Sequence, residues 1–292
     1  GYLVGRAIAS LGAGHVLAAV DLAAGTDLHH AAYRWGIVSI VVAGVLIALV
    51  GMFGRWQIQS YFDISSRAAL ADAADTAVRR VTREIQTALP NSVRVSGNYL
   101  EYIPIKDAGR YRAESDGTAT VYPLDFGSGA TATRFDVLGP AVAVTPGDQI
   151  VIYNLGIPGA DAYSSSPNNR RTPSVTGAAL TQIDSASAFV FPFASPANRF
   201  QVVGNPVTFQ CDPTAGVIRR YWNYGFLASQ PVAPASMTAG SNAILVANAA
   251  ACSFAYDPGA GQRNGIVTVR LTLSANDETV NLLNQVEVLN TP

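Results

Sequence analysis

The chain has 292 residues, of which 13% are charged, and a formal net charge of −1. This composition argues against nucleic-acid binding, because a phosphate-binding surface needs clustered Lys and Arg, and Lys106 is the only lysine. An enzyme is not expected either, since the sequence contains no GxSxG, HExxH, Walker or post-strand GxGxxG motif. We therefore predict no catalytic residue, cofactor or metal site.

Residues 1–34 are predicted to form an atypical leader, either disordered or mistranslated. The segment 7–25 is apolar, but His15 and Asp21 make it a poor membrane span.

The next segment, Gly36–Phe53, is an uncharged apolar run of eighteen residues. This length meets the lower bound for crossing a hydrocarbon core of about 30 Å. Arg and Trp flank the run on both sides, as suits the two membrane interfaces. The run predicts a transmembrane helix, and a buried core helix is the alternative. The positions expected to contact lipid or neighbouring helices are Gly36, Val41, Gly44, Leu46, Leu49 and Phe53.

The segment 55–89 has the 3.6-residue period of an amphipathic helix. Its expected apolar face consists of Ala69, Ala73, Ala77, Val81, Ile85 and Leu89, with Leu70 and Val78 beside it. The i,i+4 pairs Asp75–Arg79 and Arg80–Glu84 are expected on a solvated face. Pro90 is expected to end this helix. A single helix over 35–89 would be about 80 Å long at 1.5 Å per residue.

From Val93 onward, short runs rich in Val, Ile, Tyr and Phe alternate apolar and polar residues between turn residues, which is typical of β-strands. Residues 90–292 are therefore predicted to form a β-rich head. The segment Gly156–Gly177 is expected to be a polar loop, mobile or in contact with a partner. A closing hairpin is expected to turn near Ala275–Glu278. The predicted fold class is α+β, with a long N-terminal membrane-spanning helix that continues into an amphipathic helix packed on the head.

Cys211 and Cys252 are the only cysteines. In an exported head they would most simply form a disulfide, while two buried thiols or a metal pair are the alternatives. The balance of Lys and Arg around the apolar run slightly favours a cytoplasmic C-terminal side. We give more weight to the cysteines and expect the head outside the cytoplasm.

Several head residues have two interpretations. Tyr221, Trp222, Tyr224 and Phe226 form either a packed strand or a platform for a sugar or a partner. The pairs Arg170-Arg171 and Arg219-Arg220 are expected to be solvated surface. Sequence spacing does not bring together any two carboxylates for acid–base chemistry. The candidates are Asp125, Asp136, Asp148, Asp184 and Asp257.

A family resemblance covers about residues 41–292. It rests on the blocks Tyr61–Asp63, Ala71–Ala77 (ADAADTA), Leu89–Arg94 (LPNSVR), Phe135–Leu138, Arg199–Val203, Arg220–Trp222 with Cys211, and Cys252–Phe254 with Tyr256–Gly259. With these blocks the chain resembles the MSHA biogenesis (MshO) family of minor pilins of type IV pili, which is related to the J-type minor pseudopilins of type II secretion.

The resemblance implies a subunit that enters the bacterial inner membrane with a periplasmic head, is cleaved by a prepilin peptidase and packs its stalk helix into a pilus at the cell surface. Its implied partners are other pilin-like subunits, the pilus assembly platform and membrane lipid. The prepilin motif of the family would fall at His30–Trp35, which reads HAAYRW here. A shifted reading frame, a degenerate member and a different leader are the competing explanations.

The resemblance therefore implies a minor pilin with a non-catalytic role in pilus assembly or initiation. The alternatives are a type II secretion J-type pseudopilin and a pilus-tip adhesive module. Such a module would bind a glycan or surface through Gly156–Gly177 or Tyr221–Phe226.

Overall fold

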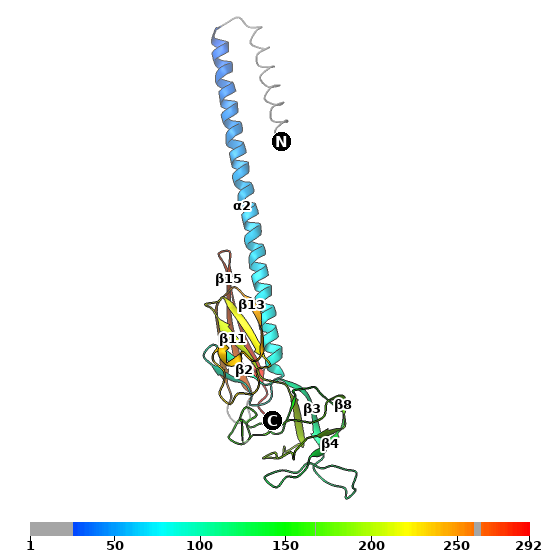
Figure 1. Cartoon of the computed structure of the whole chain (residues 1–292). Helices are drawn as coiled ribbons and strands as arrows, with labels where there is room; N and C mark the ends of the chain where they lie inside the picture. Colours follow the sequence, from blue (N-terminus) through cyan, green and yellow to red (C-terminus); the bar gives the residue numbers. More distant parts are fainter. Residues whose placement is uncertain (1–25, 167, 260–263) are drawn as a thin grey trace. The chain divides into compact units, whose positions relative to one another are not determined.

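The computed structural model describes residues 26–166, 168–259 and 264–292, with side chains described for 33–53 and from 63 onward. Residues 1–25, which carry most of the predicted leader, lie outside the described residues. The chain divides into two compact units, Gly1–Ser65 and Ser66–Pro292. The described part combines one long helix with a β-rich C-terminal body, so the α+β class is confirmed (Figure 1).

The helix α2 runs from Thr26 to Gln86. It begins nine residues before the predicted start at residue 35, because helix-compatible residues continue upstream of the apolar run. It ends three residues before the predicted end at Leu89. Extended pairing takes over there: Ala88 bridges Pro104, and Leu89 N–H donates to Ile103 O at 2.8 Å. The residue before a proline is also disfavoured in the helical region, which explains the early end.

Within the second unit, one face of α2 is buried. The buried residues are Leu70, Ala74, Ala77, Val78, Val81 and Ile85. The prediction that Ala69 and Ala73 belong to this face was wrong, since both are exposed. This stretch contains alanine at five of its first seven positions from Ala68, so its composition barely distinguishes one face from the next.

Two antiparallel sheets share one hydrophobic core with this part of α2. The five-stranded sheet has the order β1-β2-β11-β12-β13, with strands β1 (Arg94–Ser96), β2 (Tyr99–Tyr102), β11 (Val207–Asp212), β12 (Val217–Trp222) and β13 (Ser241–Ala247). The three-stranded sheet has the order β14-β15-β16, with strands β14 (Ala249–Asp257), β15 (Gly265–Ala275) and β16 (Glu278–Val288). A short 3-10 helix, η1 (Pro234–Met237), precedes β13.

The two sheets are connected covalently in two ways. The chain passes from β13 to β14 through Asn248 alone, whose φ of 61° is tolerated by asparagine. The predicted disulfide between Cys211 of β11 and Cys252 of β14 is present, with a Cα–Cα distance of 5.7 Å. The predicted closing hairpin is also present, because Asn276 and Asp277 turn between β15 and β16 with φ of 53° and 63°.

Residues 103–206 form a lobe inserted between two neighbouring strands. Tyr102 and Val207 are directly opposed on β2 and β11, so the lobe leaves and re-enters the five-stranded sheet at one point. Its main sheet has the order β7-β6-β10-β3-β4-β9, with strands β3 (Ile105–Tyr111), β4 (Arg134–Leu138), β6 (Gln149–Val151), β7 (Arg170–Arg171), β9 (Gln182–Asp184) and β10 (Arg199–Val203). Strands β5 (Val142–Val144) and β8 (Gly177–Leu180) pair beside it.

The lobe has a hydrophobic core of its own, rich in phenylalanine. Phe135 packs edge-on against Phe189 and Phe200, with ring centroids 5.3 and 5.2 Å away. A smaller cluster that includes Leu89, Ile103 and Tyr163 joins the lobe to the chain that follows α2. The predicted head over residues 90–292 thus contains two hydrophobic cores where the sequence indicated one.

Candidate functional site

The apolar part of α2 is the feature that most restricts the surroundings in which the chain is stable. Tyr33–Phe53 are twenty-one helical residues that are long and apolar enough to cross a membrane. Every residue of this segment is exposed, and Ile40 and Ile47 are each 73% exposed. The six predicted stalk positions all lie in this segment; they are Gly36, Val41, Gly44, Leu46, Leu49 and Phe53. The predicted alternative of a buried core helix is wrong, because none of the segment is buried.

The single hydroxyl in the apolar run is satisfied within the helix. Ser39 Oγ donates to Gly36 O at 2.8 Å, so it adds no unpaired polar group to the apolar segment. Exposing the apolar surface of this segment to water costs a free energy of about 25 cal/mol per Å². Its length and composition satisfy the requirements of a membrane anchor, and those of an N-terminal signal sequence as well.

Near its C-terminal end, α2 is attached to the five-stranded sheet through Glu84. Glu84 Oε2 accepts hydrogen bonds from Tyr102 Oη at 2.6 Å and from Arg220 Nε at 2.7 Å, while Arg80 Nε donates to Oε1 at 3.1 Å. Burial by itself raises the pKa of Glu84, but the hydrogen bonds from Tyr102 and Arg220 and the charge of Arg220 outweigh it and leave the pKa below its ordinary value.

These contacts correct two predictions. The pair Arg80–Glu84 forms as expected, but Glu84 does not lie on a solvated face. Arg220 is not solvated surface either, since it is half-buried between Glu84 and the ring of Trp222. Spacing along α2 correctly paired Glu84 with Arg80, but the partners from the sheet are 18 and 136 residues away in sequence.

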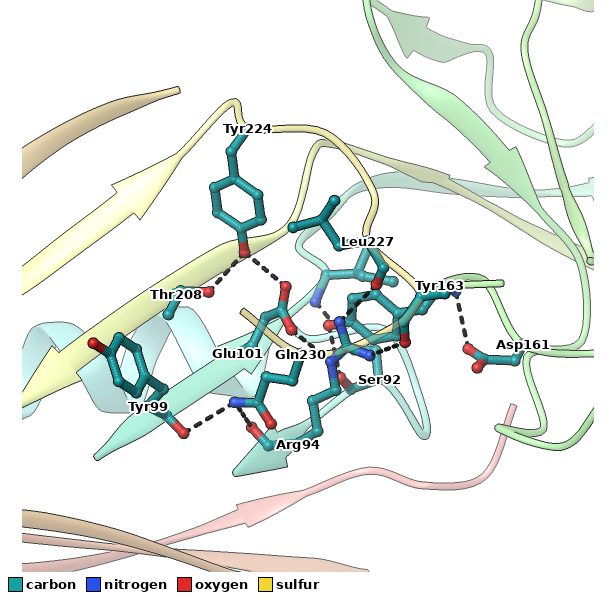
Figure 2. Close-up of polar contacts among 12 residues, drawn as sticks. Ser92, Arg94, Tyr99, Glu101, Asp161, Tyr163, Thr208, Tyr224, Leu227 and Gln230 are labelled. Atoms are coloured by element: carbon teal, nitrogen blue, oxygen red, sulfur yellow. Dashed lines mark hydrogen bonds and ion pairs between the residues drawn. The ribbon is translucent and has the colours of Figure 1, made fainter. Parts of the chain in front are cut away.

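A second, fully buried glutamate lies at the centre of a polar network (Figure 2). Glu101 of β2 accepts from Arg94 Nε at 2.5 Å and from Tyr224 Oη at 2.7 Å, and Tyr224 contacts Thr208 at 2.7 Å. Burial raises the pKa of Glu101 above its ordinary value, although Arg94 and Tyr224 act in the opposite direction.

Arg94 connects this network to the inserted lobe. Its guanidinium lies 3.6 Å from the centre of the Tyr163 ring, and Tyr163 Oη donates to Ser92 O at 2.9 Å. Arg94 also donates to the carbonyls of Leu227 and Ala228 at 2.8 Å. The network thus fixes β1, β2, β11, the loop after β12 and the loop after β6 to one another, as Figure 2 shows.

The predicted aromatic group is mainly part of the interior. Tyr221 and Tyr224 are buried, and their hydroxyls contact Gln210 at 2.8 Å and Glu101 at 2.7 Å. Trp222 is half-buried under Arg220, and Phe226 lies under Arg170. The aromatic group is therefore packed, but it is a strand only in part: Tyr221 and Trp222 lie in β12, whereas Tyr224 and Phe226 lie in the loop after it. With two buried and two half-buried rings, the group does not form an exposed binding platform.

The predicted polar loop and its arginines are also packed. Within Gly156–Gly177, the structure buries Ala162, Tyr163 and Asn169. Arg170 and Arg171 are half-buried and donate to the carbonyls of Ala162 and Val190, so the prediction that this pair is solvated was wrong. Their burial lowers the pKa of both guanidinium groups. Arg219, also half-buried, donates to Asn242 Oδ1 at 3.0 Å.

The five candidate carboxylates each have a separate structural contact. Asp136, Asp148 and Asp184 form ion pairs with Arg112, Lys106 and Arg134. Asp125 accepts from the N–H groups of Thr131 and Ala132, and Asp257 accepts from Gly259 N–H in a turn. Within the described residues, no three His, Cys, Asp or Glu side chains group as metal ligands.

Comparisons with known proteins give no further guidance: no family model, curated protein or solved structure matches the chain.

Proposed function

We propose that the chain is a minor pilin of an MSHA-type type IV pilus, a non-catalytic subunit for pilus assembly or initiation. The observation that carries this proposal is a fully exposed apolar helical segment, Tyr33–Phe53, on the same helix whose later residues are buried against a disulfide-bonded β body. An apolar segment of this kind needs lipid or other apolar helices around it.

Two further features support the proposal. A disulfide forms in an oxidising compartment, which fits a periplasmic head and later the cell surface. Gly44 and Gly51 lie seven residues apart on one side of the exposed segment, and small residues allow helices to approach closely in lipid or in a filament. The partners are then pilin-like subunits, the assembly platform and inner-membrane lipid, as the family resemblance implies.

The proposal is tested by photo-crosslinking in the native bacterium, with the cross-linking residue at Leu46 of the exposed segment. A matched control carries it at Glu114, an exposed residue of the inserted lobe. We expect the protein in filaments sheared from the cell surface, with protein adducts from position 46 and few from position 114. Release of a head that lacks residues 33–53, or absence from sheared filaments, would contradict the proposal.

A type II secretion J-type pseudopilin remains the second candidate, because the same helix and head suit it. Deletion of the gene separates the two: loss of surface pili with normal secretion supports the pilin, and loss of secretion with normal pili supports the pseudopilin.

A further inference from the structure

Two of the cationic side chains of the inserted lobe lack any partner among the described residues. The lobe contains seven Lys and Arg residues, and five of them form ion pairs or hydrogen bonds through their side chains. Lys106, Arg112 and Arg134 pair with carboxylates, while Arg170 and Arg171 donate to backbone carbonyls. The remaining two, Arg110 and Arg199, are exposed and form no ion pair or side-chain hydrogen bond with the described part of the chain.

These two arginines are neighbours. Arg110 of β3 and Arg199 of β10 are directly opposed in an antiparallel pair, which places their Cβ atoms about 4.5–5.5 Å apart on one face of the sheet. Like charges in this position destabilise a sheet. A repulsive pair without a compensating carboxylate is the kind of local conflict that proteins keep at functional sites.

A groove opens over the pair. It has a volume of about 570 Å³ and is lined by Arg110, Arg199, Ala108, Leu138, Gly139 and Pro140, and this volume is within the usual range of small-molecule sites. Leu138 is opposed to Arg110 on the other side of β3 and is 39% exposed. The sheet therefore presents a row of one apolar and two cationic side chains.

An unpaired hydrogen-bond acceptor lies on the same face. Gln201 is two residues from Arg199 along β10, and it is opposed to Ala108 of the groove. Alternation along a strand puts Gln201 on the face of Arg199. Gln201 is only 8% exposed, yet its Oε1 has no hydrogen-bond partner in the structure. A buried acceptor without a donor costs about 1–3 kcal/mol, which a ligand hydroxyl would recover.

We propose that Arg110, Arg199 and Gln201 form a binding site for an acidic saccharide. The two guanidinium groups hold the carboxylate or sulfate, and the apolar side of the sugar ring lies against Leu138 and Pro140. The Gln201 amide, whose Oε1 is buried beside the groove in the free protein, turns outward on binding and accepts a hydrogen bond from a sugar hydroxyl. This site is separate from the exposed segment of α2, so its test does not depend on the pilus assignment.

The combination of groups favours a saccharide over an acidic protein surface. Arginine matches carboxylate and sulfate oxygens through paired N–H donors. An acidic peptide side chain would satisfy these donors, but it carries no hydroxyl for Gln201. The groove, with a volume of about 570 Å³, suits a small ligand. A protein partner would need a much wider surface, since a typical interface buries about 800 Å² on each partner.

Binding is measured by isothermal titration of the full chain in detergent micelles with digalacturonate and with galactose 6-sulfate. The methyl ester of digalacturonate removes the charge, and a tetra-aspartate peptide supplies charge without hydroxyls. The variants are Arg110→Gln, Arg199→Gln and Gln201→Leu. Arg219→Gln is the matched control, because Arg219 lies in the five-stranded sheet and its guanidinium donates to Asn242 Oδ1, away from the groove residues.

We expect saturable binding of at least one acidic sugar, about tenfold weaker in each arginine variant and about threefold or more weaker in Gln201→Leu. The methyl ester should not bind. The thermal midpoints of Arg110→Gln and Arg199→Gln should stay unchanged or rise, because each removes a like-charge contact. A merely structural role for these residues would lower the midpoint instead.

Three outcomes would overturn the proposal. The first is that neither acidic sugar binds. The second is that the peptide binds as tightly as the sugar and Gln201→Leu has no effect, which would indicate a contact for an acidic protein. The third is that Arg219→Gln weakens binding as much as the site variants, which would indicate unspecific electrostatic attraction.

Discussion

Glu84 and Glu101 show how burial decides whether the pKa of a carboxyl group is raised or lowered. Glu84 accepts bonds from two arginines and a tyrosine hydroxyl, and Glu101 accepts bonds from one arginine and a tyrosine hydroxyl. The side chain of Glu84 is 19% exposed, and its partners lower its pKa below the ordinary value. That of Glu101 is 0% exposed, and burial raises its pKa despite the same kinds of partner.

The two glutamates should therefore affect stability with opposite pH dependence. A lowered pKa in the folded state contributes stability above the unfolded pKa, near 4.3, that is lost as the pH falls through the folded value. A raised pKa contributes stability below the unfolded value that is lost as the pH rises through the folded value. Glu84→Gln should cost more stability at pH 7 than at pH 3.5, and its cost at pH 7 should be about 1.5–3 kcal/mol, as for hydrogen bonds to a charged group. Glu101→Gln should cost more at pH 3.5 than at pH 7.

Urea unfolding of the full chain in detergent at both pH values checks this prediction. Asp72→Asn, on an exposed position of α2, is the control and should change stability little at either pH. Parallel pH profiles for Glu84→Gln and Glu101→Gln would show that burial does not separate the two sites.

At the scale of elements, the disulfide joins a strand of each sheet that packs with α2. The bridge spans a sequence separation of 41. On the chain-entropy estimate, closing a loop of this size stabilises the fold by about 4 kcal/mol.

Replacing both cysteines by alanine should lower the free energy of unfolding by about 2–5 kcal/mol. Chemical reduction of the unmodified chain should have a similar effect, and reduction should leave the double variant unchanged. Rapid alkylation of both thiols in the native, unreduced chain would contradict the disulfide.

The exposed segment of α2 should lose its affinity for lipid when a charge is placed in it. Val45 is near its middle and 53% exposed. An aspartate at the centre of a membrane span costs about 2.5–3.5 kcal/mol, so Val45→Asp should move the chain from the carbonate-resistant membrane fraction to the soluble fraction. Ile64→Asp, at an exposed position beyond the span, should leave the distribution unchanged. Equal effects of both variants would mean that the segment does not sit in lipid.

How far sequence predicts this structure varies from element to element. The apolar segment, the long helix and the closing hairpin follow from local patterns such as an uncharged run, a 3.6-residue period and a turn signal. The disulfide follows from the presence of only two cysteines in a head expected to be exported. The face of α2 near Ala69 was displaced by one residue, because alanine occupies both faces. The half-buried positions of Glu84, Arg170 and Arg220 were not predicted. Their partners are set by the tertiary fold, and short-range charge patterns do not show them.

The inserted lobe is the largest feature of the head that the sequence did not indicate. Its boundaries lie inside a continuous run of strand-like segments, and only the pairing of β2 with β11 shows that the chain leaves and returns at one point. Because Tyr102 and Val207 are already directly opposed, a two-residue Asn-Gly turn is long enough to join them.

We therefore expect a variant in which Asn-Gly replaces residues 103–206 to fold. The core of α2, the five-stranded sheet and the three-stranded sheet contains no residue of the lobe. The variant loses the contacts of Leu89 with Ile103 and of Arg94 with Tyr163, so its stability should fall by about 2–5 kcal/mol.

Mass mapping of the disulfide and urea unfolding in detergent check the variant. It should retain the Cys211–Cys252 bridge and unfold in a single cooperative transition, and by the same reasoning it should lose all binding of acidic sugars. A matched variant with Leu89→Gln removes the apolar side chain that the excision exposes and should be less prone to aggregate. A mispaired or reduced disulfide together with gradual unfolding would show that the lobe is needed to form the sheets, and that the head is one folding unit despite its two cores.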